Sequence, residues 1–359
     1  MNYPNNNILN KIFDKLIPHI KKNKILYFIL KPIFILIRTP FRFIMRNQSF
    51  LDLKKSNHTM KNIFIIDNRV HSMQFDIVVL LIRGSNFFYR DKWSLIVYQD
   101  PFYRYSSRKG NKEIYFNNLI NIFFQTLILL PNKPINIKFV ENISELSNII
   151  NRSTKIFPEN YNYLSSYNKD SQIENFNEND LKNFKKNQPI LKAPKYHSEI
   201  FQNYLKYWNI DKYCTITIRT KDWNNSQWNT DLNDIEIYLK FIKKNNILDN
   251  DFLIIPDTQQ EVPKALIDLL IDNNLKFHIY NQGSFSIPMR FLAYSNSYFN
   301  FASTNGPPSS FLPFLKNNAY FILKDSIQGE DYVKFINKYN KNIFLKRKII
   351  FFRKYSSKY

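Results

Sequence analysis

Short apolar segments alternate with helix-like segments through residues 201–325, and no other feature of the chain restricts its fold as strongly. The apolar segments have the composition of strands and lie at residues 213–219, 252–255, 276–280, 298–302 and 319–323. The segments between them have a helical pattern and lie at residues 231–245, 261–273, 287–295 and 309–315. Strands that alternate with helices over short connections form a parallel sheet with helices on both faces. The region is therefore predicted to be an α/β domain with a doubly wound parallel sheet.

A smaller α/β domain is predicted at residues 61–148, where strand-like and helix-like segments also alternate. Its expected strands lie at residues 62–66, 93–98 and 135–140. Residues 149–200 are rich in Asn, Lys, Ser and Glu, with Pro at intervals, which is typical of a linker or a surface excursion. The chain is thus expected to contain two α/β domains.

Both ends of the chain are basic. In residues 1–60, no apolar run approaches the roughly 20 residues that cross a bilayer. Basic residues recur near one helical face instead, as in a helix that lies in the interface of an acidic membrane. The alternative is a helix packed on the first domain. Residues 326–359 are predicted to be a C-terminal helix with a basic tail, or a second membrane-surface contact. The basic residues of the N-terminal segment are Lys24, Lys31, Arg38, Arg42 and Arg46.

The charge and the cysteine count exclude some classes of protein. The formal net charge of +22 favours anionic partners, namely nucleic acid, acidic lipid or phosphorylated substrates. Because Cys214 is the only cysteine, the chain cannot form an internal disulfide or a zinc site built on cysteine pairs. The five histidines lack close metal-ligand spacing, and Asp249 and Asp251 fit a turn before a strand. Chemistry without a metal is therefore expected.

Polar loops follow the predicted strands of the second domain. In a parallel sheet such loops lie at the edge formed by the carboxyl ends of the strands, where ligands bind. The sequence therefore predicts a ligand site at this edge. The four loops lie at residues 220–229, 256–259, 281–286 and 303–306.

The last of these loops contains Gly306, one of only 5 glycines in the chain. Glycine lets the backbone approach a ligand closely, and free amide groups at the start of a helix favour an anion. Pro307 and Pro308 lack an amide hydrogen, so the expected phosphate contacts come mostly from residues 303–306. A strand-to-helix turn without a ligand is the alternative.

Four ordered blocks of the second domain resemble a group of bacterial glycosyltransferases. They are the strand that ends in Arg219 with the loop and helix that follow, the Ile-Ile-Pro-Asp-Thr stretch at residues 254–258, the helix with Arg290 and an Ala-Tyr pair, and the stretch from Phe299 to Pro307. Together they cover about residues 213–323. The resemblance implies a GT-B-type enzyme, with two Rossmann-like domains and a nucleotide-sugar donor.

Arg219 is also distantly similar to an arginine of the fucosyltransferases with two Rossmann-like domains, where it grips the donor diphosphate. Thr220 and Lys221 stand where those enzymes have a second arginine. A guanidinium binds phosphate with two parallel hydrogen bonds, and a lysine adds a point charge. A surface ion pair is the alternative for either residue.

The resemblance and the loop positions together give a set of candidate donor-binding residues. Asp257 and Thr258 are expected to hold ribose hydroxyls, although Asp257 fits equally well as a helix cap. Arg290 is expected either to point into the same cleft or to form a surface ion pair. The full set is Arg219, Lys221, Asp257, Thr258, Arg290, Ser303, Thr304, Asn305 and Gly306.

The base for the acceptor hydroxyl is expected to come from the first domain. His71 follows a predicted strand, lies in a loop and titrates near neutral pH. Asp76 and Asp67 are the alternatives for this role. A loop histidine with only local hydrogen bonds is the competing interpretation of His71.

The sequence thus predicts a metal-independent glycosyltransferase for a hexosyl or deoxyhexosyl group. Its donor would be a nucleotide-sugar, with no further cofactor, and its acceptor a lipid-linked or cell-surface glycan in polysaccharide biosynthesis. The expected location is the inner face of the cytoplasmic membrane, as a peripheral protein, and nucleic acid is not expected as the main partner. The alternatives are a sugar-nucleotide epimerase of similar fold, a basic nucleic-acid-binding protein, and a membrane-peripheral scaffold without catalysis.

Overall fold

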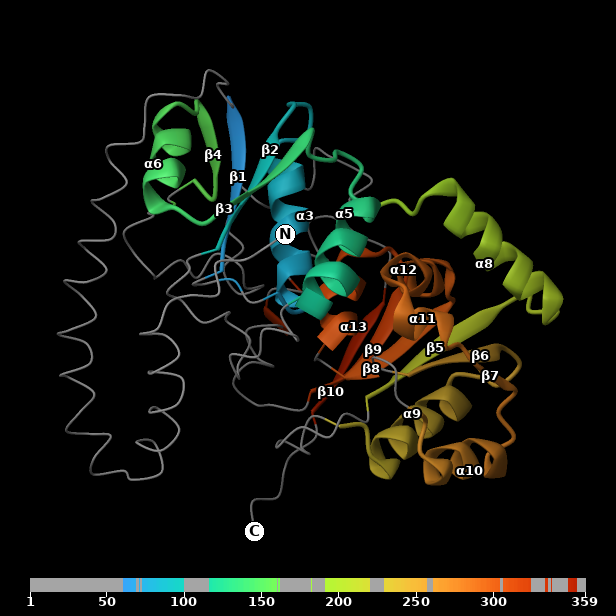
Figure 1. Ribbon diagram of the computed structural model, residues 1–359. Coiled ribbons are helices and arrows are strands. Elements are labelled where there is room, and N and C mark those ends of the chain that lie inside the picture. The colour runs from blue at the N-terminus through green and yellow to red at the C-terminus, as the bar shows by residue number, and fades with distance from the viewer. Residues whose placement is uncertain are drawn as a thin grey trace, which may run out of the picture.

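A computed structural model describes residues 61–68, 71, 73–99, 116–159, 161, 191–219, 229–256, 261–303, 306–323 and 348–353, with a few isolated positions elsewhere. The predicted N-terminal segment, residues 1–60, lies outside the described residues. The described residues form two all-parallel sheets (Figure 1).

The first sheet has the strand order β3-β2-β1-β4. Its strands are β1 (Asn62–Asp67), β2 (Ser94–Tyr98), β3 (Asn136–Val140) and β4 (Lys155–Phe157). The central strands β1 and β2 are apolar almost throughout because both of their faces are covered. α3 (Asp76–Phe87) and α5 (Gln125–Leu129) cover one face, and α6 (Ile143–Asn151) covers the other.

Strand β4 lies within the residues that the sequence assigns to a linker or surface excursion. The first domain therefore extends past residue 148, and β4 pairs with β1 through Lys155, Ile156 and Phe157. A strand of three residues is too short to give a recognisable alternation of apolar and polar positions.

The second sheet has the strand order β10-β9-β8-β5-β6-β7, with every pair parallel. The prediction of a doubly wound parallel sheet is therefore confirmed. Its strands are β5 (Tyr213–Ile218), β6 (Asp251–Pro256), β7 (Phe277–Ile279), β8 (Phe299–Ser303), β9 (Asn318–Leu323) and β10 (Ile349–Arg353).

Strand β10 corrects the basic-tail part of the interpretation of residues 326–359, while most of the expected C-terminal helix before it lies outside the described residues. Residues Ile349–Arg353 instead form the edge strand of the second sheet, in parallel register with β9. The Lys and Arg residues around this apolar run favour a basic helix in the sequence, but one paired strand neighbour and the Phe321–Phe351 ring contact are enough to hold it as a strand.

Helices cover both faces of the second sheet. Residues of α9 and α10 pack with Cys214, Ile216 and Ile218 on one face of β5. On the opposite face, Tyr213 contacts the helix α12 and packs in a cluster with residues of α8 and α13. These helices are α8 (Lys195–Tyr207), α9 (Leu232–Lys244), α10 (Lys264–Asp272), α11 (Gln282–Phe285), α12 (Ile287–Asn296) and α13 (Gly306–Phe311).

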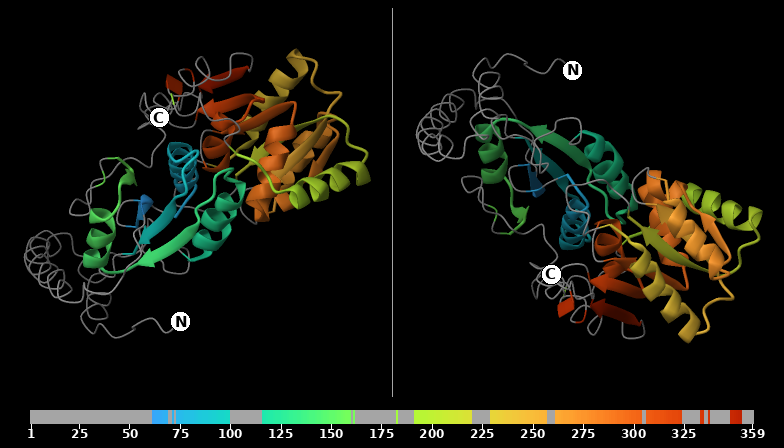
Figure 2. Two further views of the ribbon diagram at one scale, coloured as in Figure 1. Left: turned by 90° about the horizontal axis from the view of Figure 1, so that it is seen from above. Right: turned by 90° about the horizontal axis from the view of Figure 1, so that it is seen from below.

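One continuous apolar core joins the two domains. It contains residues of α3 and α5 from the first domain and of α12 and α13 from the second. The views from above and below show α3 and α5 between the two sheets (Figure 2). At this boundary Gln125 accepts a hydrogen bond from the Ile287 amide at 2.7 Å and donates one to the Phe285 carbonyl at 3.4 Å. The two domains are thus held together by both apolar and polar contacts.

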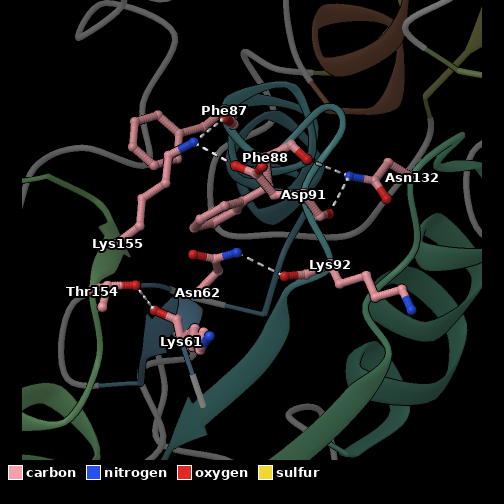
Figure 3. A network of polar contacts seen from close by, with 9 residues as sticks. All are labelled: Lys61, Asn62, Phe87, Phe88, Asp91, Lys92, Asn132, Thr154 and Lys155. Atoms are coloured by element: carbon pink, nitrogen blue, oxygen red, sulfur yellow. Dashed lines mark hydrogen bonds and ion pairs between the residues drawn. The ribbon is translucent and has the colours of Figure 1, made fainter. Parts of the chain in front are cut away.

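A polar network at the amino ends of the first sheet ties its strands to the end of α3 (Figure 3). Lys155 on β4 forms an ion pair of 2.6 Å with Asp91 and lies 4.7 Å from the centre of the Phe87 ring. The Asn132 side chain donates to the carbonyls of Phe88 and Asp91 at 2.6 and 3.3 Å. The network lies at the opposite edge from the carboxyl ends of the strands. Its role is to fix the chain segments that connect α3 to β2 and lead into β3 and β4.

We expect Gly84→Ala to destabilise the protein. A Cβ atom at this position of α3 would overlap the Phe64 ring, whose Cζ atom would be only 2.8 Å away. The Phe64 ring cannot withdraw easily, because Trp93 and Phe157 pack against it. Overpacking of this kind costs about 1–3 kcal/mol, although alanine is otherwise the better helix residue by about 1 kcal/mol. The free energy of unfolding in urea measures the outcome.

The double variant Gly84→Ala/Phe64→Leu is the control for this prediction. Since leucine vacates part of the space, the two substitutions should cost less together than the sum of their separate effects. A more stable Gly84→Ala variant, or strictly additive effects, would contradict the proposed contact.

Candidate functional site

The strand order of the second sheet reverses between β5 and β8. Numbered along the domain, the order is 6-5-4-1-2-3, which is the strand order of the dinucleotide-binding Rossmann fold. Strands β5 and β8 pair through Thr215 with Asn300 and Ile216 with Phe301. Chains leave such neighbouring strands in opposite directions, which opens a crevice at their carboxyl ends. The candidate site lies at this point.

The reversal places two of the predicted loops next to each other. Arg219 directly follows β5, and Ser303 is the last residue of β8. Gly306 begins α13 three residues later. The structure therefore brings Arg219, Ser303 and Gly306 to one edge of the sheet, where the two adjacent central strands β5 and β8 end. Five other predicted donor-binding residues lie outside the described part of the chain, namely Lys221, Asp257, Thr258, Thr304 and Asn305.

The backbone of Arg219 is fixed by Thr230. The Arg219 amide donates to the Thr230 hydroxyl at 2.9 Å, and the Arg219 carbonyl accepts from the Thr230 amide at 2.7 Å. Arg219 and Thr230 are therefore held side by side at the edge of the sheet. Asp231 then begins α9 with a capping box, in which its side chain and that of Asp234 each accept a backbone amide.

The β5 strand presents hydroxyl groups toward α12. The Thr217 hydroxyl lies 3.0 Å from the Tyr294 hydroxyl, and the Thr215 hydroxyl donates to the Asn300 side chain at 2.6 Å. All four side chains are buried. Because side chains alternate along a strand, Thr215 and Thr217 share the face of β5 that α12 covers.

Arg290 is buried. The alternative prediction of a surface ion pair for this residue is therefore wrong. Only 1% of the residue is exposed. Its guanidinium donates to the Pro256 carbonyl at 3.0 Å and to the Gly283 carbonyl. The Ser284 hydroxyl also donates to Pro256, at 2.6 Å. Arg290 therefore holds the carboxyl end of β6 against α11.

Gly306 adopts a backbone conformation that other residues rarely take. Its φ angle is 62°, in the left-handed region. Its carbonyl accepts hydrogen bonds from the hydroxyls of Ser309 and Ser310, at 2.8 and 3.4 Å. A side chain here would cost roughly 1–2 kcal/mol. The unusual position of a glycine in this glycine-poor chain thus has a conformational reason.

His71 lies in a buried polar cluster at the carboxyl end of β1. Its Nδ1 accepts the Asp67 amide at 3.0 Å, so the ring proton of the neutral form is on Nε2. The Asp67 carboxylate accepts from the Tyr161 hydroxyl at 2.8 Å. Burial lowers the pKa of His71 to about 4, against the raising effect of Asp67 and with a further lowering by Arg83.

These contacts bear on the predicted acceptor base. With Nδ1 engaged and Nε2 protonated, neither nitrogen of His71 is set to take a proton from a substrate in this arrangement. Asp76, by contrast, is exposed at the first turn of α3. α3 itself packs against α13 across the domain boundary. The role of either residue as a base stays a prediction.

A hollow of about 450 Å³ lies at the same edge of the second sheet, between the starts of α9 and α10. Part of its lining belongs to the loop and helix after Arg219 that carry the family resemblance, and the Asp231 and Asp234 capping box is visible in the sequence as a spacing. The lining residues are Thr230, Asp231, Leu232, Asn233, Pro263, Ala265 and Leu266.

No three His, Cys, Asp or Glu side chains in the described ranges come together in a way that would hold a metal ion. None of the helices in that part of the chain combines the length and the apolar character needed to cross a membrane.

Models of known protein families give no match to the chain, and neither do curated protein sequences. Several solved structures resemble the chain in shape. POFUT1 in its apo form is 7% identical over 83% of this chain and 99% of its own, with a TM-score of 0.37. A family 9 glycosyltransferase from Veillonella parvula is 8% identical over 83% and 87%, with a TM-score of 0.44. The wall teichoic acid polymerase TagF is 10% identical over 86% and 91%, with a TM-score of 0.31. The fold assignment rests on the topology of the two sheets.

Arg290→Met should destabilise the fold. The substitution keeps an unbranched apolar chain but leaves the Gly283 carbonyl, and part of the bonding of Pro256, without the guanidinium donor. A buried polar group without a partner costs about 1–3 kcal/mol. Urea unfolding measures the loss, and Arg90→Met, at an exposed position, is the control with an expected change within about 0.5 kcal/mol. Equal effects of the two substitutions would disprove the supporting role of Arg290.

The stability of the protein should fall as the pH drops from about 6.5 to about 4, in part because of His71. The folded-state pKa of about 4 lies below the ordinary value of 6.5, so the unfolded chain binds the extra proton over this range. This group alone contributes a slope of up to roughly 1.4 kcal/mol per pH unit. His71→Asn keeps an acceptor for the Asp67 amide without a titrating ring. Its unfolding free energy should depend less on pH, and parallel profiles for the two proteins would refute the assignment.

Proposed function

We propose that the protein is a glycosyltransferase that uses a nucleotide-sugar donor. The observation that carries the proposal is the reversal of strand order between β5 and β8, two adjacent strands that are followed by Arg219 and end in Ser303, respectively, at the carboxyl edge of the second sheet. Ligands of doubly wound sheets bind at this point. The sequence resemblance of the same blocks to bacterial glycosyltransferases supports the same conclusion.

The donor diphosphate is proposed to lie between Arg219 and the Ser303–Gly306 loop. A guanidinium at a strand end offers two parallel donors to phosphate oxygens. The left-handed conformation of Gly306 turns the chain sharply just before Pro307 and Pro308, so the backbone before the prolines is the part that can approach the phosphates. The remaining contacts, from Lys221, Asp257 and Thr258, belong to the same proposal.

In the proposed reaction the acceptor hydroxyl attacks the anomeric carbon of the donor sugar, and the bond to the diphosphate oxygen breaks. The acceptor proton passes to a base of the first domain, and the diphosphate leaves with its extra negative charge. Arg219 stabilises that charge where it develops. Of the two predicted bases, the exposed Asp76 fits an open site better than the buried His71. We propose that the reaction proceeds without a metal or a further cofactor.

The acceptor is proposed to be a lipid-linked or cell-surface glycan, reached at a membrane surface. The net charge of +22 is suited to phosphorylated substrates and acidic lipid. The proposed location is the inner face of the cytoplasmic membrane, as a peripheral protein.

Arg219→Ala should weaken donor binding by about tenfold or more, since it removes one charge-assisted contact. Calorimetric titration with UDP- and GDP-sugars on the unchanged protein establishes the donor first. Lys240→Ala, which removes an exposed positive charge from α9 in the same domain, is the matched control and should bind the donor normally. Absence of heat with every nucleotide-sugar would refute the function, and equal affinities of Arg219→Ala and Lys240→Ala would remove Arg219 from the site.

A further inference from the structure

The outer side of α8 carries an exposed stripe of large side chains. Tyr196, Ile200 and Tyr207 recur at helical spacing and lie along one line of the helix. They are 55%, 53% and 78% exposed. The inner side of the helix is covered instead, since Phe201 and Leu205 are buried in the main core. Figure 1 shows α8 at the periphery of the molecule, with one side turned away from the second sheet. Among the residues that the structure describes, none covers the stripe, so it is not part of the packing of this part of the chain.

An aromatic pair continues the stripe at the end of the helix. Trp208 is 47% exposed, and its ring lies edge-on to Tyr207, with 5.2 Å between the ring centres. On its other side it lies 5.2 Å from the ring of His278 on β7. His278 in turn contacts the carboxylate of Asp251 at 3.4 Å. The pair is therefore held in place from within the domain while its outer surface stays open to solvent.

The charges around the stripe are mostly positive. Residues 192–212 contain four lysines against Glu199 and Asp211. Lys195 and Lys206 lie on one side of the helix, about a quarter turn from the stripe. The Lys195 side chain is 92% exposed and forms an ion pair of 3.5 Å with Glu199, whose side chain is 60% exposed. A partner that binds this surface should therefore offer an apolar region to the stripe and negative charge to the lysines beside it.

From this combination we propose that α8 docks on an anionic membrane, with Tyr196, Ile200, Tyr207 and Trp208 in the headgroup boundary and the lysines facing the acidic headgroups. Tyr and Trp have an apolar body and a polar tip, which is why they concentrate at the membrane interface. Lysines beside an interfacial helix add attraction to acidic lipid. Tyr and Trp are enriched at protein–protein interfaces too, but lysine is depleted there, so the flanking lysines favour acidic lipid over a second protein chain.

The placement of α8 leaves the candidate site free. Trp208 contacts β7 near its amino end, and Lys212 immediately precedes β5. The aromatic end of the helix therefore lies at the amino edge of the second sheet, opposite to Arg219 and the Ser303–Gly306 loop. The proposal does not depend on the nature of the reaction at that site.

The single cysteine makes a site-specific test possible. Cys214 is fully buried, and burial raises the pKa of its thiol to about 12, so it does not compete for a thiol-directed label. Ile200→Cys, labelled with an environment-sensitive fluorophore, reports on the stripe in the full chain. Ile271→Cys is the matched control, since Ile271 is 56% exposed but lies on α10, on the opposite face of the sheet.

Vesicles of phosphatidylcholine with phosphatidylglycerol should shift the emission of the Ile200 label to the blue and leave the Ile271 label unchanged. Vesicles of phosphatidylcholine alone should give a much weaker response. Adding Lys195→Gln and Lys206→Gln should weaken vesicle binding by about fivefold for each lysine. An unchanged Ile200 label would overturn the proposal, whether the chain stays in solution or floats with the vesicles through another segment. A shift produced by concentrating the protein without vesicles would overturn it in favour of a second copy.

Discussion

The pairing of β5 with β8 is the interaction on which the candidate site depends. These strands are separated by 80 residues or more in the chain, yet their pairing sets which loops meet. Thr215 and Asn300 are partners in the register and are also joined by a buried hydrogen bond of 2.6 Å between their side chains. A slip of this register by one residue would turn Asn300 to the apolar face beside α9 and leave its amide without partners. The polar pair therefore specifies one alignment of the two central strands, and with it the position of Arg219 relative to the Ser303–Gly306 loop.

The second domain could be predicted from the sequence largely because its strands are apolar on both faces. Runs such as Phe252 to Ile255 are recognisable without any knowledge of their neighbours. Gly306 was also informative from the sequence, since its rarity in this chain pointed to a special backbone position, which the φ angle of 62° explains. Features that depend on single long-range contacts were not predictable. The short β4 and the basic-flanked β10 become strands only because β1 and β9 offer them open edges.

The side-chain roles were harder to predict than the strands. Arg290 looks like a surface or cleft residue in the sequence, because arginine is rarely buried without compensation. Its partners are the carbonyls of Pro256 and Gly283, which are far from it in the chain and which no sequence pattern displays. His71 likewise looks like an accessible loop histidine until the contacts with Asp67 are seen. Backbone groups are partners in both cases, and their position follows from the fold rather than from residue type.

The apolar core that runs from α3 and α5 into α12 and α13 makes the two sheets interdependent. If the chain were divided between its sheets, each half would present the surface that the other now covers. Neither half would then be a self-sufficient module that evolution could exchange freely between proteins, even though each sheet has a complete topology of its own. A substitution in α3 or α5 would have to be matched by a substitution in α12 or α13, as between the two sides of an obligate interface. The two halves are therefore expected to have diverged together, as one inherited unit.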